Sequence, residues 1–329
     1  MNSATLAILP SSVLETLSEK GHPDGSFLKL LHPRTRLPCL FLVWSEPNTG
    51  TAEGATSRTK FAEVQAVSPA QGRSWFMDEE VVEDGRLLVI SPMDPAFLLL
   101  PILLLVSPKD GSLGNFRPAD QLFDAAILQL EKENQDEEDV DMQSVLKDTR
   151  TFCDLECSQS ALSALCDRKD ITEDIVVYRF SEAKTTDYMK QKVSRLAAHS
   201  VLDDSKTITR SFAREGLTDD GKEDILKIAR LDAACNLIGQ YLPTSQRHLL
   251  RASFNFTALD THRAELEKVE AARTAAAEAT LPQKNSKGSA KVDSTLKKRK
   301  SSSSQGVEKL KKVNVNGMSK LDSFFKPKA

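Results

Sequence analysis

The residues whose types and spacing indicate a definite chemistry lie close to the C-terminal end of the sequence. Leu321 is followed three positions later by the adjacent aromatic residues Phe324 and Phe325, in a tail with few other large hydrophobic side chains. One turn of helix would place Leu321 and Phe324 on the same side. Such a compact apolar group suits a hydrophobic groove on another protein. The pattern therefore predicts a peptide that binds a partner.

The spacing of this segment resembles the sliding-clamp binding peptide, whose pattern is Gln-x-x-aliphatic-x-x-aromatic-aromatic. Met318 stands where that pattern has glutamine. Because methionine lacks the hydrogen-bonding amide of glutamine, the resemblance implies weaker binding. Lys320, Lys326 and Lys328 would compensate by pairing with acidic groups around the pocket. The resemblance assigns clamp binding to Met318, Leu321, Phe324 and Phe325.

A basic cluster lies in the same tail. It consists of Lys297, Lys298, Arg299 and Lys300. Short basic clusters of this kind are bound by acidic grooves as nuclear-import signals, or they attract phosphate nonspecifically. We expect the cluster to direct the protein to the nucleus, and a merely solubilising charged tail is the alternative.

No pattern typical of a catalytic centre accompanies these two signals. The sequence has no GxGxxG, GxxxxGK[ST] or GxSxG segment, and its five histidines form no HxxxH or HExxH pattern. Cys153, Cys157 and Cys166 form the nearest group of cysteines but lack the paired CxxC spacing of a zinc site. We expect them to be buried structural thiols, and we expect no catalytic residue, metal site or cofactor in this chain.

The charge of the 329-residue chain is unevenly distributed. The formal net charge is −3, but the segment from Leu281 to Ala329 has 13 basic and 3 acidic residues, so the preceding body is acidic. The longest strongly apolar run, 97–106, is about half the length that spans a bilayer. The N-terminus has no basic stretch before its short apolar segment, and the odd number of cysteines fits a reducing compartment. We therefore expect neither membrane insertion nor secretion.

The first ninety residues have the pattern of short strands separated by turns. Residues 60–67 alternate between polar and apolar side chains, while 37–44 are almost continuously apolar. Asp84 and Gly85 form a dipeptide typical of a two-residue hairpin. A strand as apolar as 37–44 is not expected to remain an open edge, so we expect a partner to cover it. Further strands are expected at 27–31, 73–77, 81–82 and 87–90, which together favour a small barrel or sandwich.

The remainder of the ordered sequence is predicted to be mainly helical. Asp94 is a suitable N-cap and Pro95 suits the first helical position. The residues from Phe97 onward are apolar on every side, so this helix should be buried, with a kink or an early end at Pro101. Further helices are expected from Pro118, over 145–165, over 181–202, over 222–242 and over 260–280.

These patterns predict an α+β protein with several parts. The parts are a β-rich domain at 1–106 that ends in the buried helix 94–106, a helical segment with an acidic linker at 107–169, a helical, winged-helix-like domain at 170–256, an exposed helix at 257–280, and a disordered tail at 281–329.

Several of these segments resemble the family of ribonuclease H2 B subunits. The most specific is Ser91-Pro-Met-Asp-Pro-Ala-Phe-Leu-Leu-Leu100, which follows Arg73-Ser-Trp-Phe76 and Asp84-Gly-Arg-Leu-Leu88. Tyr178-Arg-Phe-Ser181 and Ile238-Gly-Gln-Tyr-Leu-Pro243 are similar to the second domain of that family. The resemblance covers roughly 24–106, 175–243 and 317–325, in the family's order.

The resemblance implies a noncatalytic member of a nuclear heterotrimer, the ribonuclease H2 complex, whose other members are the A and C subunits. The N-terminal strands would interlace with the C subunit into a shared triple barrel. The A subunit would carry the carboxylates and the magnesium that cleave RNA in RNA–DNA hybrids and incise at ribonucleotides in DNA. This chain would scaffold the complex and tether it to the sliding clamp. The candidates for assembly contacts that the resemblance supplies are Trp75, Phe76, Asp94, Pro95 and Phe97.

Two other functions stay open from the residues alone. The chain would also fit a stand-alone replication or repair adaptor that binds DNA through a winged helix and the clamp through its tail. The basic residues between Thr207 and Gln246 are scattered among acidic ones and form no continuous basic face, which disfavours DNA binding. A scaffold with a clamp peptide and unrelated partners is the third alternative.

Overall fold

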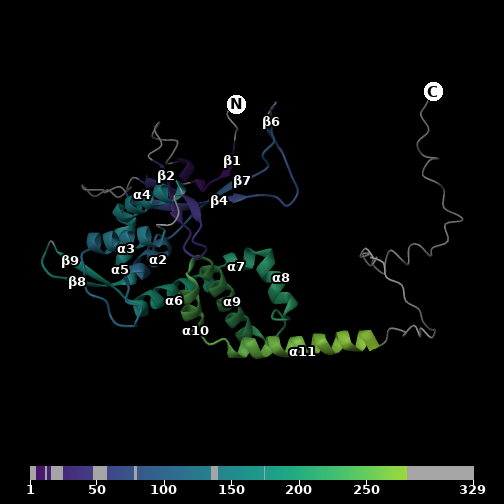
Figure 1. Ribbon diagram of the computed structural model, residues 1–329. Coiled ribbons are helices and arrows are strands. Elements are labelled where there is room, and N and C mark those ends of the chain that lie inside the picture. The colour runs from purple at the N-terminus through teal and green to yellow at the C-terminus, as the bar shows by residue number, and fades with distance from the viewer. Residues whose placement is uncertain are drawn as a thin grey trace, which may run out of the picture. The chain divides into compact units, whose positions relative to one another are not determined.

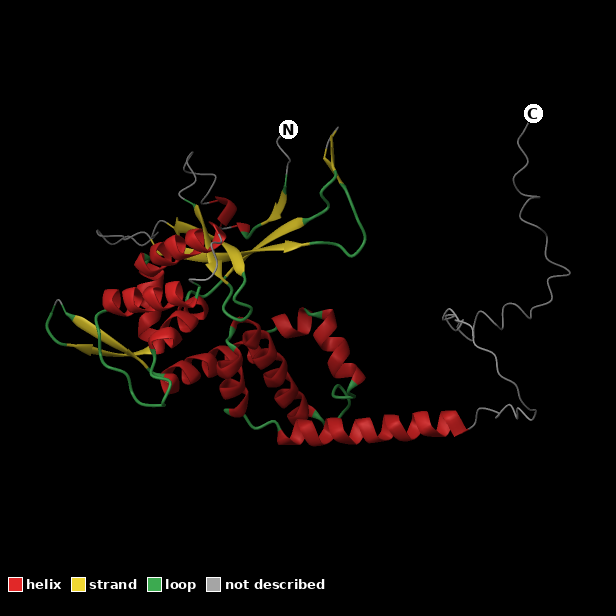
Figure 2. Ribbon diagram, viewed as in Figure 1, coloured by secondary structure: helices red, strands yellow, loops and turns green. Residues whose placement is uncertain are grey.

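The structure is a computed structural model that describes residues 5–11, 13–15, 25–46, 58–77, 80–134, 140–173 and 175–279 (Figure 1). Met1–Arg273 forms one compact unit and Thr274–Ala329 a second. Figure 2 shows the first unit as a mixture of strands and helices, in agreement with the expected α+β class. No helix among the described residues is both long and apolar enough to cross a membrane.

A five-stranded sheet forms the N-terminal part. All neighbouring strands are antiparallel except β1 and β7, which are parallel. The sheet confirms the strands expected within 27–31, 37–44, 60–67 and 87–90. In spatial order the strands are β1 (Leu6–Ile8), β7 (Leu87–Pro92), β4 (Arg58–Val67), β3 (Pro38–Glu46) and β2 (Ser26–Leu31).

Strand β3 lies inside the sheet, between β2 and β4. Phe41 and Val43 face the main core, and Leu42 and Trp44 face a smaller cluster on the opposite side of the sheet. Burial on both faces within this chain therefore explains the apolar sequence from Phe41 to Trp44, whereas Leu40 of the same strand stays 41% exposed. The expectation that a partner must cover this strand as an open edge was wrong, because β2 and β4 pair with it.

The dipeptide Asp84-Gly85 does not form the expected hairpin. The strand before it, β6 (Glu80–Val82), pairs with β5 (Trp75–Met77), whereas β7 pairs with β4. A Cβ atom on Gly85 would lie only 2.1 Å from the carbonyl oxygen of Arg73. Glycine is needed here because two backbone segments approach each other closely, and not because of a positive φ.

Helix α2 (Ala96–Val106) forms the centre of the unit. Asp94 Oδ1 accepts the Ala96 N–H at 2.9 Å, but Pro95 takes the N-cap position and the helix begins at Ala96, one residue later than the sequence predicts. The helix continues through Pro101 to Val106, so the proline does not shorten it. Residues on every side of α2 are buried, and burial of each leucine contributes roughly 1.5–3 kcal/mol. We attribute the tolerance of Pro101 to this packing.

The other helices and one hairpin follow α2 in the chain. In order they are α3 (Ala119–Glu133), α4 (Val140–Asp154), α5 (Glu156–Leu165), the antiparallel pair β8 (Cys166–Asp170) and β9 (Val176–Phe180), α6 (Glu182–Ala198), α7 (Val201–Asp204), α8 (Lys206–Arg214), α9 (Glu223–Ile238), the 3-10 helix η1 (Gly239–Tyr241), α10 (Thr244–Ala252) and α11 (Thr257–Ala279).

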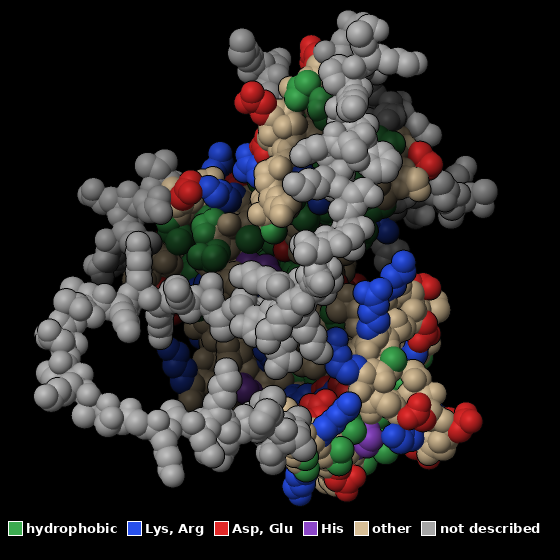
Figure 3. Space-filling model, turned by 90° about the vertical axis from the view of Figure 1, so that its right-hand side faces the viewer, with side chains coloured by type: hydrophobic (Ala, Val, Ile, Leu, Met, Phe, Trp, Pro, Cys, Tyr) green, Lys and Arg blue, Asp and Glu red, His purple; other side chains and the backbone are tan. Residues whose placement is uncertain are grey.

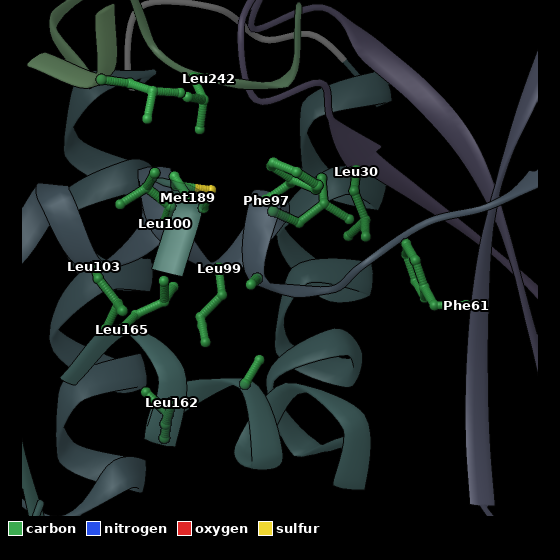
Figure 4. Close-up of a cluster of buried hydrophobic side chains, with 14 of the residues drawn as sticks. Leu30, Phe61, Phe97, Leu99, Leu100, Leu103, Leu162, Leu165, Met189 and Leu242 are labelled. Atoms are coloured by element: carbon green, nitrogen blue, oxygen red, sulfur yellow. The ribbon is translucent and has the colours of Figure 1, made fainter. Parts of the chain in front are cut away.

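One continuous cluster of buried side chains joins the sheet to the helices. Leu30 and Phe61 of the sheet, Leu99 of α2, Leu162 of α5 and Met189 of α6 all belong to it (Figure 4). Because α2 packs on both the sheet and the helices, the boundaries expected at residues 106 and 169 do not coincide with a break in the packing. The Met1–Arg273 unit has a single main core.

Helix α11 is held at its first turns and exposed beyond them. Leu259 is fully buried against α8 and α9. Arg263 forms ion pairs of 2.9 Å with Glu215 and with the buried Asp232. Val269, two turns further on, is 66% exposed, in agreement with the expectation of an exposed helix.

Candidate assembly surface

The described residues contain no cluster of side chains placed to bind a metal ion. No group of three or more His, Cys, Asp or Glu side chains among them is placed to hold a metal ion. Burial raises the pKa of the Cys153 and Cys166 thiols to about 12. Thiols with such a pKa are neutral and are weak nucleophiles and ligands.

The side of the sheet that faces away from helix α2 is apolar. We call it the outer face. Cross-strand register places Phe27 opposite Leu42, and Leu40 opposite Val64. Val13 covers part of this face, but Phe27 remains 57% exposed and Leu40 41% exposed. The outer face consists of Phe27, Leu40, Leu42, Val64 and Ile90.

A second apolar area lies where β1, β7 and the β5–β6 ribbon extend away from the helices (Figure 2). We call it the distal end. Ile8 on β1 is 54% exposed and Val67 on β4 is 50% exposed, while Phe76 and Val81 are exposed on the ribbon. Large exposed apolar side chains that gather on one part of a sheet indicate an interaction surface. The assembly surface is the outer face together with the distal end.

Trp75 and Phe76 lie on the β5–β6 ribbon and differ in their surroundings. Trp75 is half-buried, and its Nε1 donates a 3.3 Å hydrogen bond to the carbonyl oxygen of Arg86. Phe76 is 82% exposed, the most exposed large hydrophobic side chain of the described residues. Phe76 is therefore free to contact a partner, whereas Trp75 supports the ribbon.

The other three predicted assembly residues act mainly within this chain. Phe97 is buried, with its ring 5.6 Å from that of Tyr241. Pro95 precedes the first helical residue, and Asp94 accepts a 2.6 Å hydrogen bond from the Tyr188 hydroxyl and pairs with Lys192. Burial opposes the charge of Asp94, but the hydrogen bonds from Lys192 and Tyr188 outweigh it and lower the pKa of this carboxyl. These residues connect the sheet, α2 and α6.

The edge of the sheet at β2 is covered by the chain itself. The Lys29 N–H donates a 2.7 Å hydrogen bond to Asp148 Oδ2 of α4. An edge N–H that is bonded in this way cannot pair with a strand of another chain. A partner is therefore expected to contact the outer face and the distal end of the sheet and not this edge.

One buried donor on the outer side of the sheet has no acceptor among the described residues. The Trp44 side chain is 3% exposed, and its Nε1 forms no hydrogen bond within the described part of the chain. Buried donors are almost always satisfied in native proteins. The sequence alone does not reveal this residue as a site candidate, because its apolar neighbours indicate a core position.

A polar junction connects the sheet to the helices. Glu63 of β4 is 5% exposed and accepts hydrogen bonds from Gln65 Nε2 at 2.8 Å and from the Tyr241 hydroxyl at 2.9 Å. His32 Nε2 lies 4.0 Å from the other Glu63 oxygen. Burial and the Glu63 carboxylate raise the pKa of Tyr241 to about 12, so the phenol stays protonated and donates. We call Glu63, Gln65, Tyr241 and His32 the polar junction.

His32 also organises the loop between β2 and β3. Its Nδ1 accepts the N–H groups of Arg34 at 3.2 Å and Thr35 at 3.3 Å. An Nδ1 that accepts cannot carry a proton, so the geometry requires the neutral imidazole with its hydrogen on Nε2, facing Glu63. Burial lowers the pKa of His32, which also favours this neutral form.

The lowered pKa of His32 makes the stability of the protein depend on pH. The unfolded chain binds the His32 proton more readily than the folded chain, so this contribution to the free energy of unfolding is complete above about pH 6.5 and decreases as the pH falls below that value. His32→Leu should lower the free energy of unfolding at pH 7.5 by about 1–2 kcal/mol, because two N–H groups lose their acceptor. Urea unfolding of the full chain between pH 5 and 8 measures both effects.

His32→Asn is the matched control, because its Oδ1 can accept the same N–H groups and does not titrate. Above pH 6.5, the difference in unfolding free energy between wild type and His32→Asn should stay constant. Below pH 6.5, the wild type should lose stability relative to His32→Asn, because only the histidine takes up a proton on unfolding. A difference that is independent of pH would contradict the assignment.

The predicted tail sites lie outside the described residues. They are the clamp-binding residues Met318, Leu321, Phe324 and Phe325 and the basic cluster Lys297, Lys298, Arg299 and Lys300.

Comparison with known proteins identifies two family matches along the chain. Residues 8–94 match the Ydr279p protein triple barrel domain, and residues 97–251 match the wHTH domain of the Ydr279p protein family, described as an RNase H2 complex component. The boundary at 94–97 falls directly before helix α2, so this helix belongs to the winged-helix match and not to the β-rich domain in which the sequence pattern placed it.

Several curated proteins are similar over most of the chain. The B subunit of ribonuclease H2 from Xenopus laevis is 29% identical over 270 residues, which cover 78% of this chain and 76% of that protein. The Mus musculus protein of the same name is 26% identical over 300 residues, which cover 87% of this chain and 85% of that protein. The Homo sapiens protein of the same name is 23% identical over 260 residues, which cover 77% of this chain and 74% of that protein.

Proposed function

The chain belongs to the Ydr279p family of RNase H2 complex components, and on this premise we propose that it is a noncatalytic accessory subunit of a heterotrimeric ribonuclease H2 complex. The observation that carries this proposal is the assembly surface, on which Phe76 is 82% exposed and Phe27 57% exposed.

In the proposed complex, the other two members cover the outer face and the distal end. The C subunit would complete the triple barrel. The A subunit would carry the carboxylates and magnesium that cleave RNA in RNA–DNA hybrids and incise at ribonucleotides in DNA. This chain would need no cofactor of its own.

Introducing negative charge at the distal end tests this assignment. Val67→Asp combined with Phe76→Asp should weaken co-purification with the A and C subunits at least tenfold, because each carboxylate would lose its water in the interface. Both side chains are exposed, so the circular dichroism spectrum of the full chain should not change. Pull-down of the co-expressed complex gives the measurement.

The control is Leu113→Asp, because Leu113 is 72% exposed in the loop before α3 and lies outside the assembly surface. Assembly of this variant should be normal. Unchanged recovery of both partners with the double variant would contradict the proposed surface. Cleavage of an RNA–DNA hybrid by the purified chain alone would contradict its noncatalytic role.

We further propose that the C-terminal peptide tethers the complex to the sliding clamp. The support is the spacing of Leu321, Phe324 and Phe325 in a polar tail. The aliphatic and aromatic side chains would enter a hydrophobic pocket of the clamp as one helical turn.

Substitution in this peptide should change clamp affinity in both directions. Replacing Phe324 and Phe325 by alanine should reduce binding of the full complex to the clamp at least tenfold, because the apolar anchors are lost. Met318→Gln should increase the affinity, because it restores the missing amide hydrogen bonds. Calorimetric titration provides the dissociation constants. Ser319→Ala is the control, and unchanged affinity in the double alanine variant would contradict the peptide assignment.

We also propose nuclear localisation through the basic cluster 297–300. Replacing its four residues by alanine should move the tagged chain from the nucleus to the cytoplasm, as seen by fluorescence microscopy, because the import machinery loses its cationic contacts. The experiment requires cells in which the other two members of the complex are depleted, since these could carry the chain into the nucleus. Retained nuclear signal under that condition would contradict the proposal.

The alternative of a stand-alone DNA-binding adaptor has less support. In the helical part, Arg230 pairs with Asp203 and Arg251 pairs with the buried Asp232. Figure 3 shows basic and acidic side chains next to one another among the described residues on the face that it draws. A DNA-binding helix usually presents unpaired cations along one side.

A further inference from the structure

A groove lies where the β2–β3 loop meets helix α2 and the start of α10. It has a volume of about 400 Å³. Its floor is apolar and its rim is basic, and none of its lining residues belongs to the assembly surface. We call it the basic groove. The floor consists of Pro33, Pro101, Leu104, Leu105 and Pro243.

The rim of the basic groove carries more positive than negative charge. Arg34, Arg36 and Lys109 line it together with one carboxylate, that of Glu133. Arg36 Nη2 lies 3.6 Å from Glu133 Oε2, so this carboxylate is already paired. Lys109 forms no ion pair with any described residue and is exposed. The groove therefore has two cations in excess.

The two arginines are held in place by the loop. Among the described residues, Arg36 is the one non-glycine residue with a positive φ, at 59°. Its N–H donates a 2.9 Å hydrogen bond to the His32 carbonyl oxygen, and Arg34 donates to the side chain of Gln240. Strained backbone of this kind is often found at functional sites. Because the loop is fixed in advance, an anionic ligand would find these side chains already positioned.

We propose that the basic groove binds an acidic peptide of a partner protein, with a bulky apolar side chain on the floor and flanking Asp or Glu side chains at the rim. The charge excess selects an anionic ligand. The aliphatic and proline floor selects a peptide rather than nucleic acid, because no aromatic side chain lines the groove for base stacking. A phosphate chain would leave the floor uncovered, whereas leucine or phenylalanine would bury it.

The test uses the full chain and a fluorescein-labelled peptide, Asp-Glu-Asp-Phe-Leu-Asp-Glu, with fluorescence anisotropy as the readout. Arg34→Glu combined with Lys109→Glu should reduce the affinity at least tenfold, because both unneutralised cations become repulsive. Leu104→Ser should also weaken binding severalfold, because the floor loses apolar area. Lys132→Glu is the matched control, because this exposed lysine of α3 does not line the groove. The variant should bind the peptide with the affinity of the wild type.

Two further probes distinguish the occupants. The peptide Asp-Glu-Asp-Ser-Ser-Asp-Glu has the same charge and should bind at least tenfold more weakly, because it has no side chain for the floor. A labelled twenty-nucleotide thymidine strand should compete poorly. The proposal would be overturned if the two peptides bound the wild-type chain with equal affinity. It would also be overturned if the double variant bound the first peptide as tightly as wild type does, or if the oligonucleotide bound more tightly than that peptide. The unfolding midpoint of each variant shows that it is folded.

Discussion

The whole fold depends on the burial of one helix that is apolar on all sides. Helix α2 exposes almost none of the residues from Ala96 to Leu103, because it packs on α3 and α5 and shares one buried cluster with side chains of the sheet. A helix of this kind cannot serve as a surface element of a separate domain. The β-rich and helical parts, which match two different family models, therefore share one core in this chain.

Polar contacts fix the direction in which the two parts meet. Apolar packing alone is tolerant of small rotations, whereas the hydrogen bonds of Glu63 with Gln65 and Tyr241 require a definite geometry. Asp94 has the same effect on the other side of α2, through Tyr188 and Lys192. The same loop that places His32 in the polar junction also places Arg34 and Arg36 in the basic groove. The orientation of the two parts and the shape of the groove are thus coupled.

Local signals in the sequence predict much of this structure. The periodicity after Pro118 predicts the inward residues Leu122 and Phe123, and both are buried in α3. The strand β8 was not predicted, because its charged sequence has neither apolar alternation nor β-branched residues and forms only through pairing with β9. The parallel pairing of β1 with β7 joins residues about eighty positions apart, which no local pattern encodes. The apolar pattern of the helix predicts that Phe97 is buried, as it is, whereas the resemblance alone placed it among the candidates for assembly contacts.

The candidate sites also differ in how far the sequence alone reveals them. The tail peptide is recognisable because its three apolar residues contrast with a polar surrounding. The basic groove cannot be recognised in the sequence, because its lining residues come from the β2–β3 loop, α2, the end of α3 and the start of α10. Likewise, Trp44 gives no sequence signal as an unpaired donor, because only the folded sheet shows which acceptors lie near its indole.

The hydrogen bond between Lys29 and Asp148 has a consequence for biosynthesis. Its two residues are 119 positions apart, so the ribosome completes β2 long before the acceptor on α4 exists. During that interval the nascent sheet presents a bare edge, and long-range pairing is slow compared with local helix formation. Translation order thus creates a window in which newly made chains are prone to aggregate, and chaperones that bind extended segments would act on this interval.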